Sequence, residues 1–465
     1  MELIIFCLFI VFVVFLYHSS GKRPNTPPGP RGIFGIVLDL SRKQPWKTFA
    51  RWAEEHGETV YIDVLGNSVL ILNSHESILA ALEKQGTNFA HRPTLTIVGE
   101  LMGLDQSLPL TNYNDRLRKQ RKMTHLTFNA SSNPKHNELK QLIVEELIRT
   151  LNRKPDAPMS AFRLAIGRMI VGTTYGFDIK AENDRYIEDA EKIMEMIGPM
   201  LFPGHPVDLL PALKYLPRWL PFHVNAAAAK SLVVDMVERP FEHAKALMKQ
   251  GLVRSAFVQN AMEAKTDDEN LDYYEHMVKW AAVSLYEAGS DSTSAVLSAF
   301  LVAMTTFPDK QAKAQKEIDS VVGLGRLPII SDREHLPYVN SLVKECMRWH
   351  VPLPLGFPRR SDAHDIFQGF DVPAETVILP NLWQLSRECQ NPEAFEPERF
   401  LSFTDPKLVD PTTYAFGFGR RLCPGKQFAL DSLFLVVSSV LSNFTIHLAK
   451  DSVPFVPLAT TGLIR

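Results

Sequence analysis

The residues best suited to chemistry lie near the end of the chain, around Cys423 in the stretch FGFGRRLCPG (416–425). Its glycines would let the backbone approach a flat ligand closely. Arg421 places a fixed positive charge two residues before the thiol. The apolar segment 426–441 predicts a helix that begins just after Cys423, where backbone N–H groups stabilise a thiolate. Such a cysteine has three interpretations: a catalytic nucleophile, an inert core residue or a metal ligand.

A second candidate is an acid inside an apolar segment. Residues 277–304 are rich in Ala and Ser and predict a long helix that is buried on most sides. Asp291 lies within it and is followed by Ser292 and Thr293. A buried carboxylate is costly unless it is paired or used, so this group indicates function, although a Ser/Thr-rich packing face is the alternative. Gly289 should let the helix open and make room for a small ligand.

Two further patterns are weak when taken alone. Glu345 and Arg348 are three residues apart, so they would pair on one helix face, as many surface ion pairs do. Five of the seven residues from Arg116 to Lys122 are basic, which is typical of a solvated helix face. A small nucleic-acid patch is the other interpretation, but the run has no interleaved aromatic residues.

Composition limits the class of protein. The chain has 465 residues, 45% of them hydrophobic, which is enough for a sizeable core. Its 50 Lys and Arg against 52 Asp and Glu give a net charge of -2, so no basic excess indicates a nucleic-acid partner. Four scattered cysteines without a Cys-x-x-Cys pair exclude a disulfide scaffold and structural zinc of that type.

These residues require a mainly helical domain to position them. Segment 57–73 alternates apolar and polar residues about Gly66-Asn67, which predicts a β-hairpin. Segment 139–151 has helical periodicity. Residues 199–222 hold six prolines and predict a loop between helices, which either dips into a membrane or caps the core. We therefore expect a single, mainly α domain with a small β region.

The N-terminus predicts a membrane anchor. Residues 3–17 form an unbroken apolar run, which as a helix would cover about 22 Å against ~30 Å of hydrocarbon. A cleaved signal peptide is the alternative, but the basic residues follow the run and no small-residue cleavage site does. That asymmetry holds the rest of the chain on the cytoplasmic side. The predicted parts are an anchor (1–20), a Pro-rich hinge (21–33) and a catalytic domain (34–465).

With the loop, charge and helix taken together, Phe416, Gly419, Arg421, Cys423 and Gly425 resemble the haem-binding signature of the cytochrome P450 family. The resemblance implies that Cys423 is the axial thiolate ligand of the iron of haem b. Thiolate donation favours O–O cleavage in such centres. The fold implied is the mainly helical cytochrome P450 fold.

The other motifs gain meaning from this resemblance. Arg121 and Arg359 match positions that hold haem propionates, as Arg421 does. Leu117 stands where the family has a tryptophan, so one propionate hydrogen bond should be missing. The remaining basic residues of 116–122 would face an acidic flavoprotein donor.

The acid in the long helix resembles the family's oxygen-activation segment, in which Asp291 and a following alcohol relay protons. Ser292 stands where threonine is usual, and Thr293 could substitute for it. By the same resemblance, Glu345, Arg348 and Arg399 form a buried structural network that holds the cysteine loop.

The whole chain, and segment 206–222 in particular, resembles microsomal members from fungi. This implies a monooxygenase of the endoplasmic reticulum membrane that hydroxylates or epoxidises a small lipophilic substrate in secondary metabolism. Electrons would come from NADPH through a flavoprotein reductase, and no nucleic acid would bind. The alternatives are a haem-thiolate isomerase or dehydratase, an inactive haem-binding membrane protein and, more remotely, a cysteine hydrolase. Segment 381–400 is about three residues shorter than is usual in the family, and the chain ends at 460–465, where relatives continue into a last strand. These departures indicate either an error in the gene model or a weakened enzyme.

Overall fold

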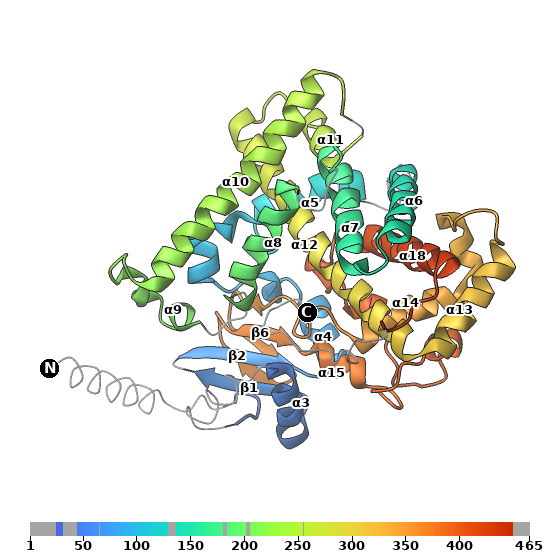
Figure 1. Ribbon diagram of the computed structural model, residues 1–465. Helices are drawn as coiled ribbons and strands as arrows, with labels where there is room; N and C mark the ends of the chain where they lie inside the picture. The colour runs from blue at the N-terminus through green and yellow to red at the C-terminus, as the bar shows by residue number, and fades with distance from the viewer. Residues whose placement is uncertain are drawn as a thin grey trace.

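The computed structural model describes residues 25–30, 44–64, 66–128, 136–179, 184–200, 205–253 and 255–449. Figure 1 shows a large body of helices above a small sheet, which confirms the predicted mainly α architecture with a small β region. The predicted anchor and the final residues 460–465 lie outside the described residues. Among the helices that are described, none is both long enough and apolar enough to cross a bilayer.

The main sheet confirms the predicted hairpin. Strand β1 (Thr59–Val64) pairs antiparallel with β2 (Asn67–Leu72), and Gly66 in the turn has φ +82°. The sheet continues through β6 (Val377–Pro380), which is parallel to β2, to β3 (Arg359–Arg360). A second sheet pairs β4 (Asp365–Phe367) with β5 (Phe370–Val372). Because β3 contains Arg359, the sheet positions one of the predicted site residues.

Sixteen α-helices are described, and the long ones build the upper body. They are α3 (Pro45–His56), α4 (His75–Leu79), α5 (Asp115–Phe128), α6 (Asn137–Arg153), α7 (Pro158–Tyr175), α8 (Arg185–Ile197), α9 (Pro206–Leu209), α10 (Pro221–Lys249), α11 (Phe257–Glu263), α12 (Leu271–Thr306), α13 (Pro308–Val321), α14 (Pro337–Trp349), α15 (Leu382–Arg387), α16 (Arg399–Ser402), α17 (Pro411–Tyr414) and α18 (Lys426–Asn443). The predicted helices 139–151, 277–304 and 426–441 correspond to α6, α12 and α18.

Helix α12 runs through the middle of the molecule and packs most closely on α7 (Figure 1). The expectation that Gly289 opens this helix is wrong, because α12 is unbroken from Leu271 to Thr306. Gly289 serves packing instead: a Cβ atom there would lie 2.9 Å from Cδ1 of Ile170 on α7. The glycine therefore lets two buried helices approach each other.

The Pro-rich segment before α10 forms two short helices and is partly packed against the core. Helix α9 and a short helix at Pro211–Tyr215 precede α10. Tyr215 and Trp219 are 80% and 75% exposed, whereas Phe222 packs against the main core. Of the aromatic residues that could meet a membrane here, the structure therefore leaves Tyr215 and Trp219 on the surface.

Candidate functional site

The cysteine loop is closed by its own backbone. The N–H of Cys423 donates to the carbonyl of Phe416 at 2.8 Å, and α18 begins three residues after the thiol. Gly419 has φ +50°, and a Cβ atom there would lie 2.5 Å from the carbonyl oxygen of Leu82. Only glycine fits that position, because both the left-handed backbone and the close approach exclude a side chain.

The charges that act on the thiol of Cys423 are not those that the sequence predicts. Burial raises the pKa of Cys423, while the backbone N–H of Gly425 and the charges of Arg121 and Lys426 lower it. The prediction that Arg421 supplies the nearby charge is wrong, because its guanidinium turns away to the carbonyls of Ala90 and Thr111. A metal ion that displaces the thiol proton would stabilise the thiolate that burial disfavours.

Four arginines gather at the same end of the cavity as the cysteine loop. Arg121 donates to the carbonyl of Leu422 at 2.9 Å, and Arg359 donates to that of Phe418 at 2.8 Å. Arg92, which the sequence analysis did not single out, donates to the backbone carbonyls of Pro109, Phe357 and Pro358. Nothing in the local pattern around Arg92 separates it from a surface arginine, so only its burial reveals it.

The positive charge of this arginine cluster is not balanced by carboxylates of the described residues. None of the four arginines forms an ion pair with a carboxylate in the part of the chain that the structure describes. Burial, and then repulsion by Arg359 and Arg121, lowers the pKa of Arg421 to about 9. Burial and repulsion by Arg121 lower that of Arg359 to about 10, and its Nη1 has no hydrogen-bond partner. Because guanidinium stays protonated in proteins, the cluster fits a ligand with carboxylate groups.

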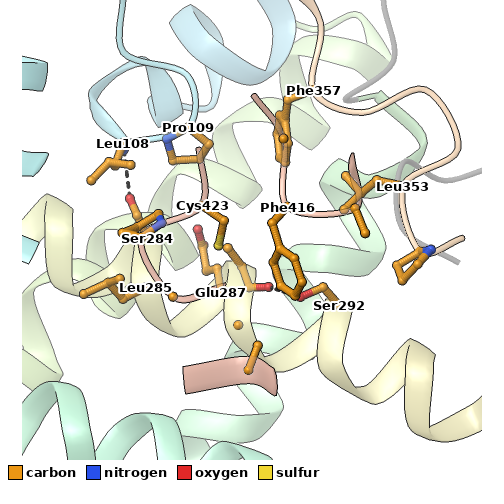
Figure 2. Close-up of a pocket in the computed structure, with 18 of the residues that line it drawn as sticks. Leu108, Pro109, Ser284, Leu285, Glu287, Ser292, Leu353, Phe357, Phe416 and Cys423 are labelled. Carbon is orange, nitrogen blue, oxygen red and sulfur yellow. Dashed lines mark hydrogen bonds between the residues drawn. The ribbon is translucent and has the colours of Figure 1, made fainter. Parts of the chain in front are cut away.

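The thiol and the arginines line one large cavity, which Figure 2 shows in close-up. Helix α12 forms the side opposite the cysteine loop with Ser284, Leu285, Glu287 and Ser292. Most other lining residues are apolar; they include Leu108, Ile166, Met169, Ile170, Leu353, Phe357 and Phe416. The cavity thus offers an apolar chamber between a thiol and two helical hydroxyls.

Of the three predicted relay residues, Ser292 and Thr293 line the cavity, but Asp291 does not. The hydroxyl of Ser292 donates to the carbonyl of Ala288 at 2.7 Å. Burial raises the pKa of Asp291 to about 6, Arg163 opposes that shift, and Glu191 adds to it. Arg163 and Glu191 are both about half exposed and lie 3.6 Å apart. Asp291 therefore lies between a surface ion pair and the cavity hydroxyls.

The predicted structural network is assembled around Glu345. Both of its oxygens accept from Arg348, at 2.7 and 2.8 Å, and Arg399 lies at 3.2 Å. Although burial lowers it, the pKa of Arg348 is raised overall, because its guanidinium donates hydrogen bonds to the carboxylate of Glu345. Arg399 also reaches the carboxylate of Glu396 at 3.4 Å, and the remaining bonds of the two arginines go to backbone carbonyls of 386–394. Among the described residues, none of these bonds reaches the cysteine loop. The network braces the segment that precedes the loop, rather than the loop itself.

The family model described as Cytochrome P450 matches residues 24–464, which is nearly the whole chain. The chain belongs to the cytochrome P450 family.

Known members are similar over most of their length. "Cytochrome P450 monooxygenase 208" from Postia placenta is 33% identical, and the alignment covers 94% of this chain and 86% of the relative. "Cytochrome P450 monooxygenase COX2" from Coprinopsis cinerea is 34% identical over 95% and 86%. "Tryptamine 4-monooxygenase" from Psilocybe cyanescens is 32% identical over 100% and 96%. This cytochrome P450 is accordingly an oxidoreductase of the monooxygenase class, and its family implies haem, a redox partner and a small-molecule substrate.

The described residues of this cytochrome P450 fit haem. The iron of haem would bind the thiol of Cys423, and its flat apolar face would lie against the lining residues of α12. Its two propionates would pair with the arginines that have no carboxylate partner among the described residues. Leu117, at the position of the expected tryptophan, is fully buried and has no side-chain donor. Arg92 lies where it could supply a donor instead.

Proposed function

We propose that this cytochrome P450 binds haem b and hydroxylates or epoxidises a small lipophilic substrate in fungal secondary metabolism. Electrons would come from NADPH through a flavoprotein reductase. The protein would act at the cytoplasmic face of the endoplasmic reticulum, held by residues 1–20. The observation that carries the proposal is the shared cavity of Cys423, the arginine cluster and the hydroxyls of α12.

The residues divide the work by their position. Cys423 would ligate the iron, while Arg92, Arg121, Arg359 and Arg421 would hold the propionates. Haem iron with a thiolate ligand supplies the activation of dioxygen. The apolar lining would exclude water and orient the substrate over the reacting face.

Proton delivery would pass from the surface through α12. The Arg163–Glu191 pair faces solvent, and the charges of both residues act on the pKa of Asp291. A carboxyl group with a pKa of about 6 accepts and releases protons readily near neutral pH. Asp291 would pass a proton to the hydroxyl of Ser292 or Thr293, which face the cavity.

The proposal is tested on Cys423→Ala in the full-length protein. The parent should show the reduced-CO absorption band of thiolate-ligated haem and should consume NADPH with its reductase, depending on dioxygen. The variant should lose that band, because in the described part of the chain Cys423 is the only cysteine that lines the cavity. A variant that keeps the band would contradict the ligand assignment. Turnover of the parent without NADPH or dioxygen would favour an isomerase or dehydratase.

A further inference from the structure

Glu287 is the only acidic side chain among the described residues that line the cavity. The cationic lining residues are the four arginines beside the cysteine loop. Glu287 comes instead from α12, one helical turn before Asp291 (Figure 2). The cavity that it lines is mostly apolar, with residues such as Ile166, Met169, Ile170, Leu285 and Val296.

The carboxylate lacks the partner that other buried acids have. Five Asp and Glu residues are buried in the described part of the chain. Four of them form an ion pair with at least one Lys or Arg: Asp189 with Arg239, Asp332 with Arg326, Glu345 with Arg348, and Asp431 with Arg333. Glu287 forms no ion pair there, and its Oε1 has no hydrogen-bond partner. A buried carboxylate is strongly disfavoured unless a cation or donor satisfies it.

Two of the α12 hydroxyls that line the cavity, those of Ser284 and Ser292, already have protein partners. Ser284 donates to the carbonyl of Trp280 at 2.6 Å and accepts from the N–H of Leu108 at 2.9 Å. Ser292 donates to Ala288. Glu287 lines the same cavity, and its buried Oε1 has no hydrogen-bond partner among the described residues, so the acid can accept a donor from a ligand once its side chain turns toward it.

The charge of this acceptor depends on what enters the cavity. Burial, with the nearby charge of Asp291, raises the pKa of Glu287 to about 8. No cation among the described residues offsets that cost. A ligand that brings a positive charge would stabilise the ionised carboxylate, whereas a neutral ligand would not.

We propose that Glu287 binds the protonated nitrogen of the substrate, so that this enzyme acts on lipophilic molecules that carry a basic amine. The inference deepens the proposed function and rests on it. The apolar lining would hold the carbon skeleton, and the single acid would fix the end that carries the amine. Selectivity would come from leaving the acid unpaired when a neutral molecule enters.

The test measures binding by calorimetry to the full-length holoprotein, with two probes of similar size. N,N-dimethyl-3-phenylpropylamine is cationic, and N,N-dimethyl-3-phenylpropanamide is neutral. The parent should bind the amine about tenfold or more tightly than the amide. Glu287→Gln should reduce the amine affinity by a similar factor and leave the amide affinity nearly unchanged.

Two further variants control for charge and folding. Asp272→Asn removes a carboxylate from the exposed first turn of the same helix and should change neither affinity. Glu287→Asp keeps the negative charge and should retain the preference for the amine. It therefore tests the role of the charge even if Glu287→Gln folds poorly. Equal affinities in the parent would overturn the inference. The inference would also fail if Glu287→Gln still preferred the amine and the amine shifted the Soret band in the way typical of nitrogen-ligated iron. The amine would then be bound by the iron and not by Glu287.

These outcomes are independent of the test of Cys423. Binding is measured without turnover, so the preference for the amine is judged even if the oxygen chemistry differs from the proposal. If the parent protein lacks the thiolate band, the proposed function is overturned. If the parent lacks the preference for the amine, only the role of Glu287 is overturned.

Discussion

At the scale of single residues, two neighbouring hydroxyls compete for one role. Ser292 and Thr293 both line the cavity, whereas the acid expected to feed them faces the α7–α8 side. Serine has no branching methyl group, so its hydroxyl samples more rotamers than that of threonine. The helical bond to Ala288 holds it in one of them.

We therefore expect Ser292→Ala to bind haem normally but to divert electrons to peroxide, and Ser292→Thr to keep or improve coupling. Asp291→Asn should slow turnover by roughly 10²–10⁴-fold, the range typical of general acid–base groups. The measurement is product formed per NADPH consumed, with peroxide counted in parallel. If only Thr293→Ala uncouples the enzyme, the relay runs through Thr293. If neither alanine variant has an effect, the relay proposal fails.

Glu287 also predicts how stability depends on pH. Its pKa is raised from an ordinary value of 4.5 to about 8, so the folded protein holds a proton that the unfolded chain loses at lower pH. Stability should therefore fall as pH rises through this window, because the folded state binds more protons. Asp291, whose pKa is also raised, contributes in the same direction at lower pH.

Between about pH 6 and about pH 9, the apparent Tm of the parent should fall by several degrees more than that of Glu287→Gln. Comparing the two proteins cancels the titration of groups that they share. The experiment uses ligand-free holoprotein and thermal unfolding followed by circular dichroism. Parallel pH profiles would show that Glu287 is ionised or solvated in the folded state.

At the scale of elements, the cysteine loop depends on a contact with a distant segment. Gly419 lies against the carbonyl of Leu82, which belongs to the helical turn after α4. Arg121 from α5 and Arg359 from β3 donate to the same loop. A helix, a strand and a turn from separate parts of the chain thus hold the thiol before α18.

Gly419→Ala should lower haem incorporation strongly, because it combines left-handed strain of about 1–2 kcal/mol with a clash against a backbone carbonyl. Gly323→Ala is the matched control: Gly323 has φ +73° but no atom within 4 Å of the added Cβ. The haem-to-protein ratio and the apparent Tm are measured for both. Similar losses in the two variants would show that strain alone, and not the contact with Leu82, is responsible.

At the scale of the whole molecule, the exposed aromatic residues before α10 present a second apolar surface. Tyr215 and Trp219 are exposed in a segment with several prolines. Large aromatic side chains of this kind favour the interface between headgroups and acyl chains. Membrane attachment would then have two parts, an anchor at 1–20 and this surface.

Deleting residues 1–20 should release the protein from membranes only partly, and adding Tyr215→Ser and Trp219→Ser should complete the release. Leu324→Ser removes a residue that is 92% exposed after α13 and should have no effect. Flotation with liposomes measures each variant. Complete release by the deletion alone would show that Tyr215 and Trp219 do not contact the membrane. Protection of the folded domain from protease in sealed microsomes would contradict the cytoplasmic orientation.

The sequence by itself determined the family, the helices and the cysteine loop. The motif around Cys423 is local: its glycines, its thiol and the following helix lie within a few residues, so their spacing is visible without the fold. The β1–β2 hairpin and α12 were predictable for the same reason, since periodicity and turn residues act over short distances. The buried-charge argument that identified Asp291 would also have identified Glu287 in the same helix, had it been applied there.

Only the tertiary structure decided which charges meet. Arg92 and Arg421 are separated by more than three hundred residues but share one end of a cavity, and Arg121, rather than Arg421, lies near the thiol. It also showed that Gly289 serves packing against α7 and that Glu287, not Asp291, faces the ligand space. Burial and partner choice depend on contacts between distant segments, because the pKa and the cost of a charge are set by its surroundings and not by its neighbours in the chain.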